Sequence, residues 1–208
     1  MPSNSAMSPL ALVAPQFNAD STSLRVKPPF SWATSTIFAR SWERASCGAG
    51  TDGWAELEEA GKLKAVITQN IDNLHQMAGS KHVLELHGSV YRNDCMRCGK
   101  SYDFKYMKAA EGVPRCSCGG IIKPDVVLYE EGLNDRTINE SVRAISQAQV
   151  LIIGGTSLAV YPAAGLIDYF SGEHLVVINK SPTPRDRYAD LLIKEPIGQV
   201  FSQIKVKK

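Results

Sequence analysis

Four of the five cysteines lie close together, in two short pairs. Two residues separate Cys95 from Cys98, one residue separates Cys116 from Cys118, and 17 residues (99 through 115) lie between the pairs. Four thiolates from two tight turns match the tetrahedral coordination of a structural zinc ion. Four unligated buried cysteines are the alternative. Because every position is a cysteine, none is left open for water, and we expect a structural Zn²⁺ that stabilises the fold without doing chemistry.

Polar residues and glycines follow four short apolar segments of the chain. These groups are 68–72, 86–88, 154–158 and 178–180. Taken singly, a histidine such as His87 is most often a structural residue, and Gly-Thr-Ser is most often a turn. Together they indicate a binding site, because doubly wound folds bind ligands beyond the carboxyl ends of their strands.

The elements that must position these groups alternate between strands and helices. Apolar runs without alternation indicate buried strands at 65–68, 83–87, 150–153 and 175–178, and an extended stretch at 121–129. Helices are expected at 54–62, 134–147 and 162–169, with a last one beginning near 196. This order predicts an α/β fold, a Rossmann-like parallel sheet with helices on both faces. The cysteine segment breaks the alternation and is therefore an inserted small zinc-binding module.

The composition sets the domain organisation. The 208 residues fit one domain with an inserted module. We expect irregular or disordered structure over 1–53, a folded domain over 54–204 with the zinc module at about 90–121, and a tail at 205–208. Leu10–Ala14 is a candidate short strand within the first segment.

Charge and cysteine count indicate which partners and which compartment to expect. Lys and Arg (23) nearly balance Asp and Glu (21), so the net charge of +2 gives no reason to expect nucleic acid or an anionic membrane as a partner. No apolar run reaches the roughly 18 residues of a spanning helix. Five cysteines, an odd number, argue against a secreted disulfide framework. We expect a reducing, cytoplasmic location.

In their order along the chain, these motifs resemble the sirtuin family of NAD-dependent protein lysine deacylases, and bacterial members in particular. The resemblance rests on TQNID at 68–72, LHG at 86–88, the paired cysteines, PDVV at 124–127 and GTSL at 155–158, and it covers roughly 54–204. It implies transfer of an acyl group from lysine to ADP-ribose, with release of nicotinamide.

The resemblance also implies roles for individual residues. His87 would be the general base, since the pKa of imidazole lies near neutrality. NAD would contact seven residues: Gln69, Asn70 and Asp72 around the nicotinamide and its ribose, Gly155, Thr156 and Ser157 around the ribose and phosphates, and Asn179 at the adenosine ribose. An acyl-lysine protein or peptide would add by β-augmentation along an edge containing Val126, Val127, Tyr129 and Glu131. Sirtuins usually have glycine where this chain has Glu130.

Two sirtuin features are missing from their expected places. The family opens with a strand leading into Gly-Ala-Gly-x-Ser, whose amides hold phosphates, followed by a Pro-Asp-Phe-Arg motif. Cys47–Thr51 resembles the glycine loop, but a polar segment precedes it. We therefore interpret the chain as an N-terminally altered or truncated sirtuin that lacks the first strand and the phosphate loop. Either Leu10–Ala14 substitutes for the strand, or the chain folds poorly alone.

Our leading interpretation is an NAD-dependent protein lysine deacetylase. The first alternative is a catalytically impaired sirtuin remnant that acts as a zinc-containing protein-binding module. The second is a zinc-ribbon nucleic-acid binder, which the small excess of basic residues in the cysteine segment supports only weakly.

Overall fold

A six-stranded parallel sheet forms the centre of the molecule. The computed structural model describes residues 10–14, 49–128, 130–159 and 161–205. The strand order is β3-β2-β1-β7-β8-β9, and every pairing is parallel. The strands are β1 Leu10–Ala14, β2 Leu63–Thr68, β3 Val83–Glu85, β7 Val150–Gly154, β8 His174–Ile178 and β9 Leu191–Ile193.

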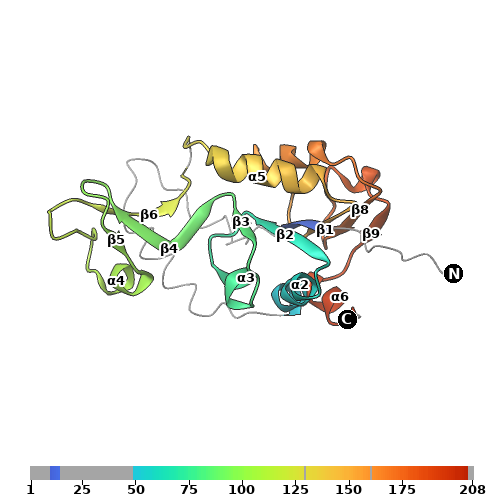
Figure 1. The fold of residues 1–208 in the computed structure, drawn as a ribbon, viewed down its shortest axis with the longest axis horizontal. Helices are drawn as coiled ribbons and strands as arrows, with labels where there is room; N and C mark the ends of the chain where they lie inside the picture. The colour runs from blue at the N-terminus through green and yellow to red at the C-terminus, as the bar shows by residue number, and fades with distance from the viewer. Residues whose placement is uncertain (1–9, 15–48, 129, 160, 206–208) are drawn as a thin grey trace.

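Helices cover both faces of this sheet, as the sequence predicts (Figure 1). The elements on one face are α5 Asp135–Ser146 and the 3-10 helix η2 Ala163–Tyr169; those on the other are α2 Ala49–Glu59 and α6 Ile197–Phe201. Successive strand residues point to opposite faces. Ile67 is buried with Ile145 of α5, whereas its neighbour Val66 is buried with Trp54 of α2 and Phe201 of α6.

The first strand is present, which corrects the expectation that it is missing. β1 lies in the middle of the sheet, where Val13 pairs with Ile67 of β2 and with Ile153 of β7. The expectation of irregular structure over 1–53 therefore fails for 10–14 and from Ala49 onward. The rest of that segment (1–9 and 15–48) lies outside the described residues.

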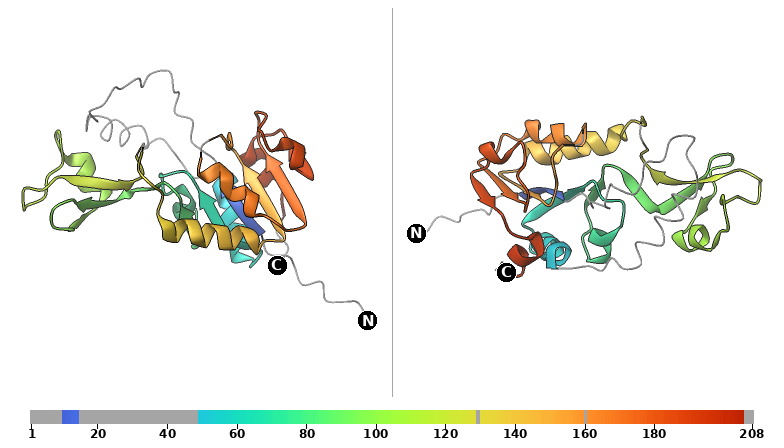
Figure 2. Two further views of the ribbon diagram at one scale, coloured as in Figure 1. Left: turned by 90° about the horizontal axis from the view of Figure 1, so that it is seen from above. Right: turned by 180° about the vertical axis from the view of Figure 1, so that it is seen from behind.

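The cysteine segment forms a separate antiparallel sheet at one end of the molecule. It contains β4 Gly88–Cys95, β5 Ser101–Tyr102, α4 Phe104–Ala109 and β6 Ile122–Val126, with the strand order β5-β4-β6. Figure 2 shows this module standing off from the parallel sheet in both views. Two short elements complete the fold, α3 Leu74–Met77 and the 3-10 helix η3 Asp186–Tyr188.

The described helices include none with the length and apolar character needed to cross a membrane.

Candidate functional site

The ends of β2 and β3 bring Gln69 and His87 into direct contact. The strands pair in parallel, and the Leu86 amide donates to the Thr68 carbonyl at 2.9 Å just beyond them. The Nδ1 atom of His87 lies 3.1 Å from the Gln69 carbonyl oxygen. A carbonyl oxygen can only accept a hydrogen bond, so this contact assigns the hydrogen to Nδ1 and leaves Nε2 as the basic nitrogen.

The surroundings of His87 favour the neutral imidazole. Burial lowers its pKa below the ordinary value, and the hydrogen bond to the Gln69 carbonyl opposes this only in part. With the hydrogen held at Nδ1, Nε2 carries the lone pair. A neutral imidazole with a fixed tautomer and an available Nε2 can accept a proton at neutral pH.

The segment after β2 supplies a buried carboxylate and a buried amide. Asp72 is 6% exposed, and its Oδ1 accepts from the Leu74 amide at 3.1 Å. Burial raises the pKa of Asp72 by more than this hydrogen bond lowers it. Gln69 is 5% exposed, and its Oε1 is buried without a partner among the described residues. Such an acceptor is costly to leave unpaired, and it fits a ligand that donates a hydrogen bond.

A second group lies at the ends of β7 and β8. Gly155 has φ 59° and donates its amide to the Ile178 carbonyl at 3.0 Å. Thr156 is buried and accepts from the Leu158 amide through Oγ1, whereas Ser157 is exposed. Asn179 donates through Nδ2 to the Ser181 carbonyl at 2.8 Å.

Both groups lie at the same edge of the sheet, because all six strands are parallel. The central strand β1 separates β2 from β7, which places the two groups roughly 10 Å apart, two strand spacings. The structure brings Gln69 and His87 into contact and keeps the residues after β7 and β8 at a distance. A ligand that touches both groups must extend across the end of β1.

The expected substrate edge joins this site through the main chain. Gly88 pairs with Val126, and the Val127 amide donates to the His87 carbonyl at 3.1 Å. Gly88 has φ 75°, and a Cβ there would come within 1.9 Å of the Asp125 carbonyl oxygen, so this close approach requires glycine.

Glu131 makes its contacts within its own loop. Its Oε2 accepts from the Leu128 amide at 3.0 Å and from Lys123 Nζ at 3.2 Å, and these bonds lower the pKa of the carboxyl. Glu131 thus closes the turn after β6. Tyr129 lies outside the described residues.

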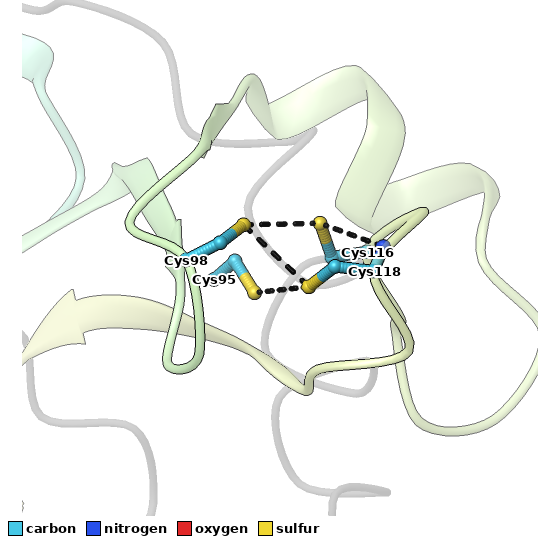
Figure 3. A group of neighbouring side chains, drawn as sticks. All are labelled: Cys95, Cys98, Cys116 and Cys118. Atoms are coloured by element: carbon cyan, nitrogen blue, oxygen red, sulfur yellow. Dashed lines mark hydrogen bonds between the residues drawn. The ribbon is translucent and has the colours of Figure 1, made fainter.

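The four cysteines form a group that can hold one metal ion. The side chains face one another across two turns (Figure 3), and all four Sγ atoms lie within 4.8 Å of each other. Three Sγ pairs are 3.5–3.6 Å apart, close to the roughly 3.8 Å expected for thiolates tetrahedral about zinc. The Arg97 and Cys118 amides donate to the sulfurs of Cys95 and Cys116. The predicted zinc ligands are therefore positioned to bind the ion.

The described part of the glycine segment at Cys47–Thr51 is helical. Ala49, Gly50 and Thr51 begin helix α2, and Cys47 and Gly48 lie outside the described residues. Directly after β1, where the family has its glycines, the sequence reads Pro15-Gln16-Phe17.

Sequence reasoning missed two polar arrangements beside the site. Arg92 bridges Glu85 and Asp125, and His75 is buried with both ring nitrogens unpaired among the described residues. The ion pairs carry no sequence signal, since their partners lie on different strands. The only hint at His75 was its place within a polar segment that follows a buried strand.

Comparisons with known proteins identify the family of the chain. The Sir2 family matches residues 6–162. An NAD-dependent protein deacetylase of Clostridium acetobutylicum is 62% identical over 152 residues, which is 72% of this chain and 62% of that protein. A second one, from Cutibacterium acnes, is 52% identical over 161 residues, covering 77% and 66%. The chain thus spans about 62% of the length of the first of these relatives.

Solved structures extend the likeness to the fold. A structure described as Sir2 with a p53 peptide and NAD⁺ is 33% identical, with a TM-score of 0.77. The match covers 94% of this chain and 91% of that one.

Proposed function

Because the chain belongs to the Sir2 family, we propose that it is an NAD-dependent protein lysine deacetylase, which transfers an acyl group from lysine to ADP-ribose and releases nicotinamide. The proposal rests on two contacts of His87, one through its ring and one through its main chain; we call the hydrogen bond between the Val127 amide and the His87 carbonyl the joint. Its ring Nδ1 is bound to the Gln69 carbonyl, and its own carbonyl accepts from Val127 on the expected peptide edge. One residue thus connects the expected cofactor side with the expected substrate side.

The residues after β2 fit the nicotinamide half of NAD. Gln69 Oε1 is a buried acceptor without a partner in the described part of the chain, which complements the amide N–H donors of nicotinamide. In this proposal Asn70 and Asp72 orient the ribose and the amide, and Asn179 holds the adenosine ribose. Gly155, Thr156 and Ser157 lie beside the phosphates, where the absence of a side chain at Gly155 lets a ligand approach the backbone closely. When bound, NAD supplies an electrophilic anomeric carbon with nicotinamide as the leaving group.

His87 provides the proton acceptor. Its Nδ1 hydrogen is held by the Gln69 carbonyl, so Nε2 presents a lone pair. Since burial lowers the pKa of this imidazole, it is neutral at pH 7 and would accept a proton from a ribose hydroxyl of bound NAD.

The acyl-lysine peptide lies along the β6 end in this proposal. Val126 and Val127 lie at this edge, where the Val126 carbonyl accepts from Lys123 Nζ at 3.1 Å and the Val127 amide donates to the His87 carbonyl. Lys123 also binds Glu131, which holds the following turn. Main-chain recognition of this kind gives loose sequence selectivity. Zinc-binding thiolates require a reducing compartment, so we place the protein in the cytoplasm.

The phosphate half of NAD fits less well, and this observation favours a second candidate function. A proline follows β1 directly. Proline has no amide hydrogen to offer a phosphate, and the two residues after it are not glycine. A sirtuin-derived zinc-containing module that binds acylated protein without turning over NAD would show this pattern.

Titration of zinc-loaded protein with NAD, followed by a nicotinamide-release assay with an acetyl-lysine peptide, separates the two candidates. For the enzyme we expect release that falls about 10²–10⁴-fold in His87→Ala and is unchanged in His174→Ala, an exposed histidine at the opposite end of the strands. Folded protein that binds the peptide but neither binds NAD nor releases nicotinamide would establish the second candidate.

A further inference from the structure

Arg92 lies in a bulge of β4 beside the candidate site. β4 and β6 pair at Ser89 with Asp125 and resume at Asn93 with Pro124, so residues 90–92 have no residue opposite them on β6. A bulge of this kind re-aims side chains. Here it turns the Arg92 guanidinium back toward the pairing, where Nε donates to Asp125 Oδ2 at 2.8 Å and Nη1 donates to Glu85 Oε2 at 2.5 Å.

The burial of Glu85 makes its ion pair with Arg92 important for the structure. Its side chain is only 7% exposed, and its second oxygen, Oε1, accepts from Gln76 Nε2 at 2.9 Å. A buried carboxylate is stable only while its oxygens are paired. The planar guanidinium can serve two carboxylates at once, whereas a lysine ammonium acts as a single point charge. Arg92 therefore ties a buried anion of β3 to an exposed anion of β6.

The two carboxylates flank the main-chain joint of the candidate site. Glu85 lies two residues before His87, and Asp125 lies two residues before Val127. The Val127 amide donates to the His87 carbonyl between them. Arg92 thus gives the ends of β3 and β6 a second connection, beside the hydrogen bond between the Val127 amide and the His87 carbonyl.

We infer that Arg92 is a positioning residue, which fixes the His87 imidazole relative to the edge that receives the acylated peptide. The inference rests on the proposed function for its catalytic consequence. Its structural consequence, slow exchange of the Val127 amide with solvent, rests on geometry alone. Without Arg92, Glu85 Oε2 loses its partner, the carboxylate turns toward solvent, and the ends of β3 and β6 separate.

The test compares Arg92→Ala and Arg92→Lys with wild-type protein and with Arg136→Ala. Arg136 is a matched control, since it is 86% exposed and pairs only with Glu140 one turn along α5 among the described residues. For Arg92→Ala we expect the Val127 amide to exchange with solvent about 10-fold faster or more, while the Ile67 and Ile153 amides keep their protection. We expect kcat/KM for an acetyl-lysine peptide to fall about 10–100-fold, with a raised KM. Arg92→Lys should lie between wild type and alanine, and Arg136→Ala should match wild type.

Equal exchange of the Val127 amide in wild type and Arg92→Ala would overturn the inference. So would a uniform rise at Val127, Ile67 and Ile153, because a merely structural residue would give that result. If Arg92→Ala does not fold, Asp125→Ala removes one of the two carboxylate partners of Arg92 at a half-exposed side chain and must give the same local change. If wild type releases no nicotinamide, the proposed function fails and the exchange measurement alone decides the inference.

Discussion

Glu130 adopts a backbone conformation that suits glycine. Its φ is 70°, in the left-handed region, and its side chain is exposed. This conformation costs an L-residue roughly 1–2 kcal/mol, a strain that glycine does not have. Glycine loses more backbone entropy on folding, however, and this loss offsets part of the gain. We expect Glu130→Gly to raise the free energy of unfolding by about 0.5–1 kcal/mol in urea titrations. Glu173→Gly, at an exposed glutamate with negative φ, should lower it. A loss of stability in both variants would contradict this reading of the loop.

His75 makes the stability of the fold depend on pH. It is 2% exposed, both ring nitrogens are unpaired among the described residues, and burial lowers its pKa to about 4. Below pH 6.5 the unfolded chain binds a proton that the folded protein takes up only near pH 4. This histidine's contribution is therefore complete above pH 6.5 and decreases by up to about 3 kcal/mol as the pH falls to 4.

Substitution of His75 isolates that contribution. We expect His75→Phe to fold, since a carbon ring loses no hydrogen bond there, and to show a weaker fall of unfolding free energy between pH 7 and pH 4. His174→Gln, at an exposed histidine, should keep the wild-type dependence. If His75→Phe keeps it as well, other groups govern the pH response. Urea titrations at four or five pH values provide the measurement.

Among the individual site residues, those carried by strand ends could be predicted from sequence, and those defined by long-range pairing could not. Gln69 and His87 each follow an apolar run, so their shared edge follows from parallel strands. The ion pairs of Arg92 with Glu85 and Asp125 depend on a three-residue bulge in β4, which no periodicity in the sequence indicates. The loop-closing contacts of Glu131 depend equally on a turn whose shape the sequence does not indicate.

At the scale of elements, sequence periodicity predicted the longer helices and strands, whereas the shortest elements could not be predicted from it. The helix expected at 134–147 is α5 Asp135–Ser146, and the strand expected at 175–178 lies within β8. The helix expected at 162–169 is a 3-10 helix, Ala163–Tyr169. α3 and β9, with four and three residues, are too short to show a period. Tertiary contacts define such elements more than local propensity does.

The zinc module depends on its metal more than the parallel sheet does. Its apolar cluster consists of Cys95, Cys116 and Ile122 with two partly buried neighbours, so two of its three buried members are themselves ligands. The sheet has two larger clusters of its own. We expect a chelator to expose the Met96 and Cys116 amides to exchange while the Leu151 amide stays protected, and added Zn²⁺ to restore them. Protection of the module amides in excess chelator would show that the cysteines are not a structural metal site.

The whole molecule is organised around β1, although this strand is separated from the next described residue by 34 positions, 15–48. A five-residue apolar run without a repeat predicted at most a short strand, because only the parallel partners on both sides define its place. Without it, β2 and β7 would face each other across an unfilled gap, and the two groups of site residues would lose their common edge. The integrity of the candidate site therefore depends on five residues far from it in sequence.

A proline substitution tests this dependence through the backbone. Leu12 lies inside the strand, where proline removes a ladder hydrogen bond, so we expect Leu12→Pro to lower the free energy of unfolding by at least about 2–3 kcal/mol. Leu10→Pro is the matched control: Leu10 is the first residue of the strand, where the register with β2 is already irregular, and proline is tolerated best at that position. Equal stability of the two variants in urea titrations would mean that β1 does not occupy the centre of the sheet. A loss confined to Leu12→Pro, with the zinc module still protected, would show that the central strand holds the parallel sheet together and that the module folds around its own metal.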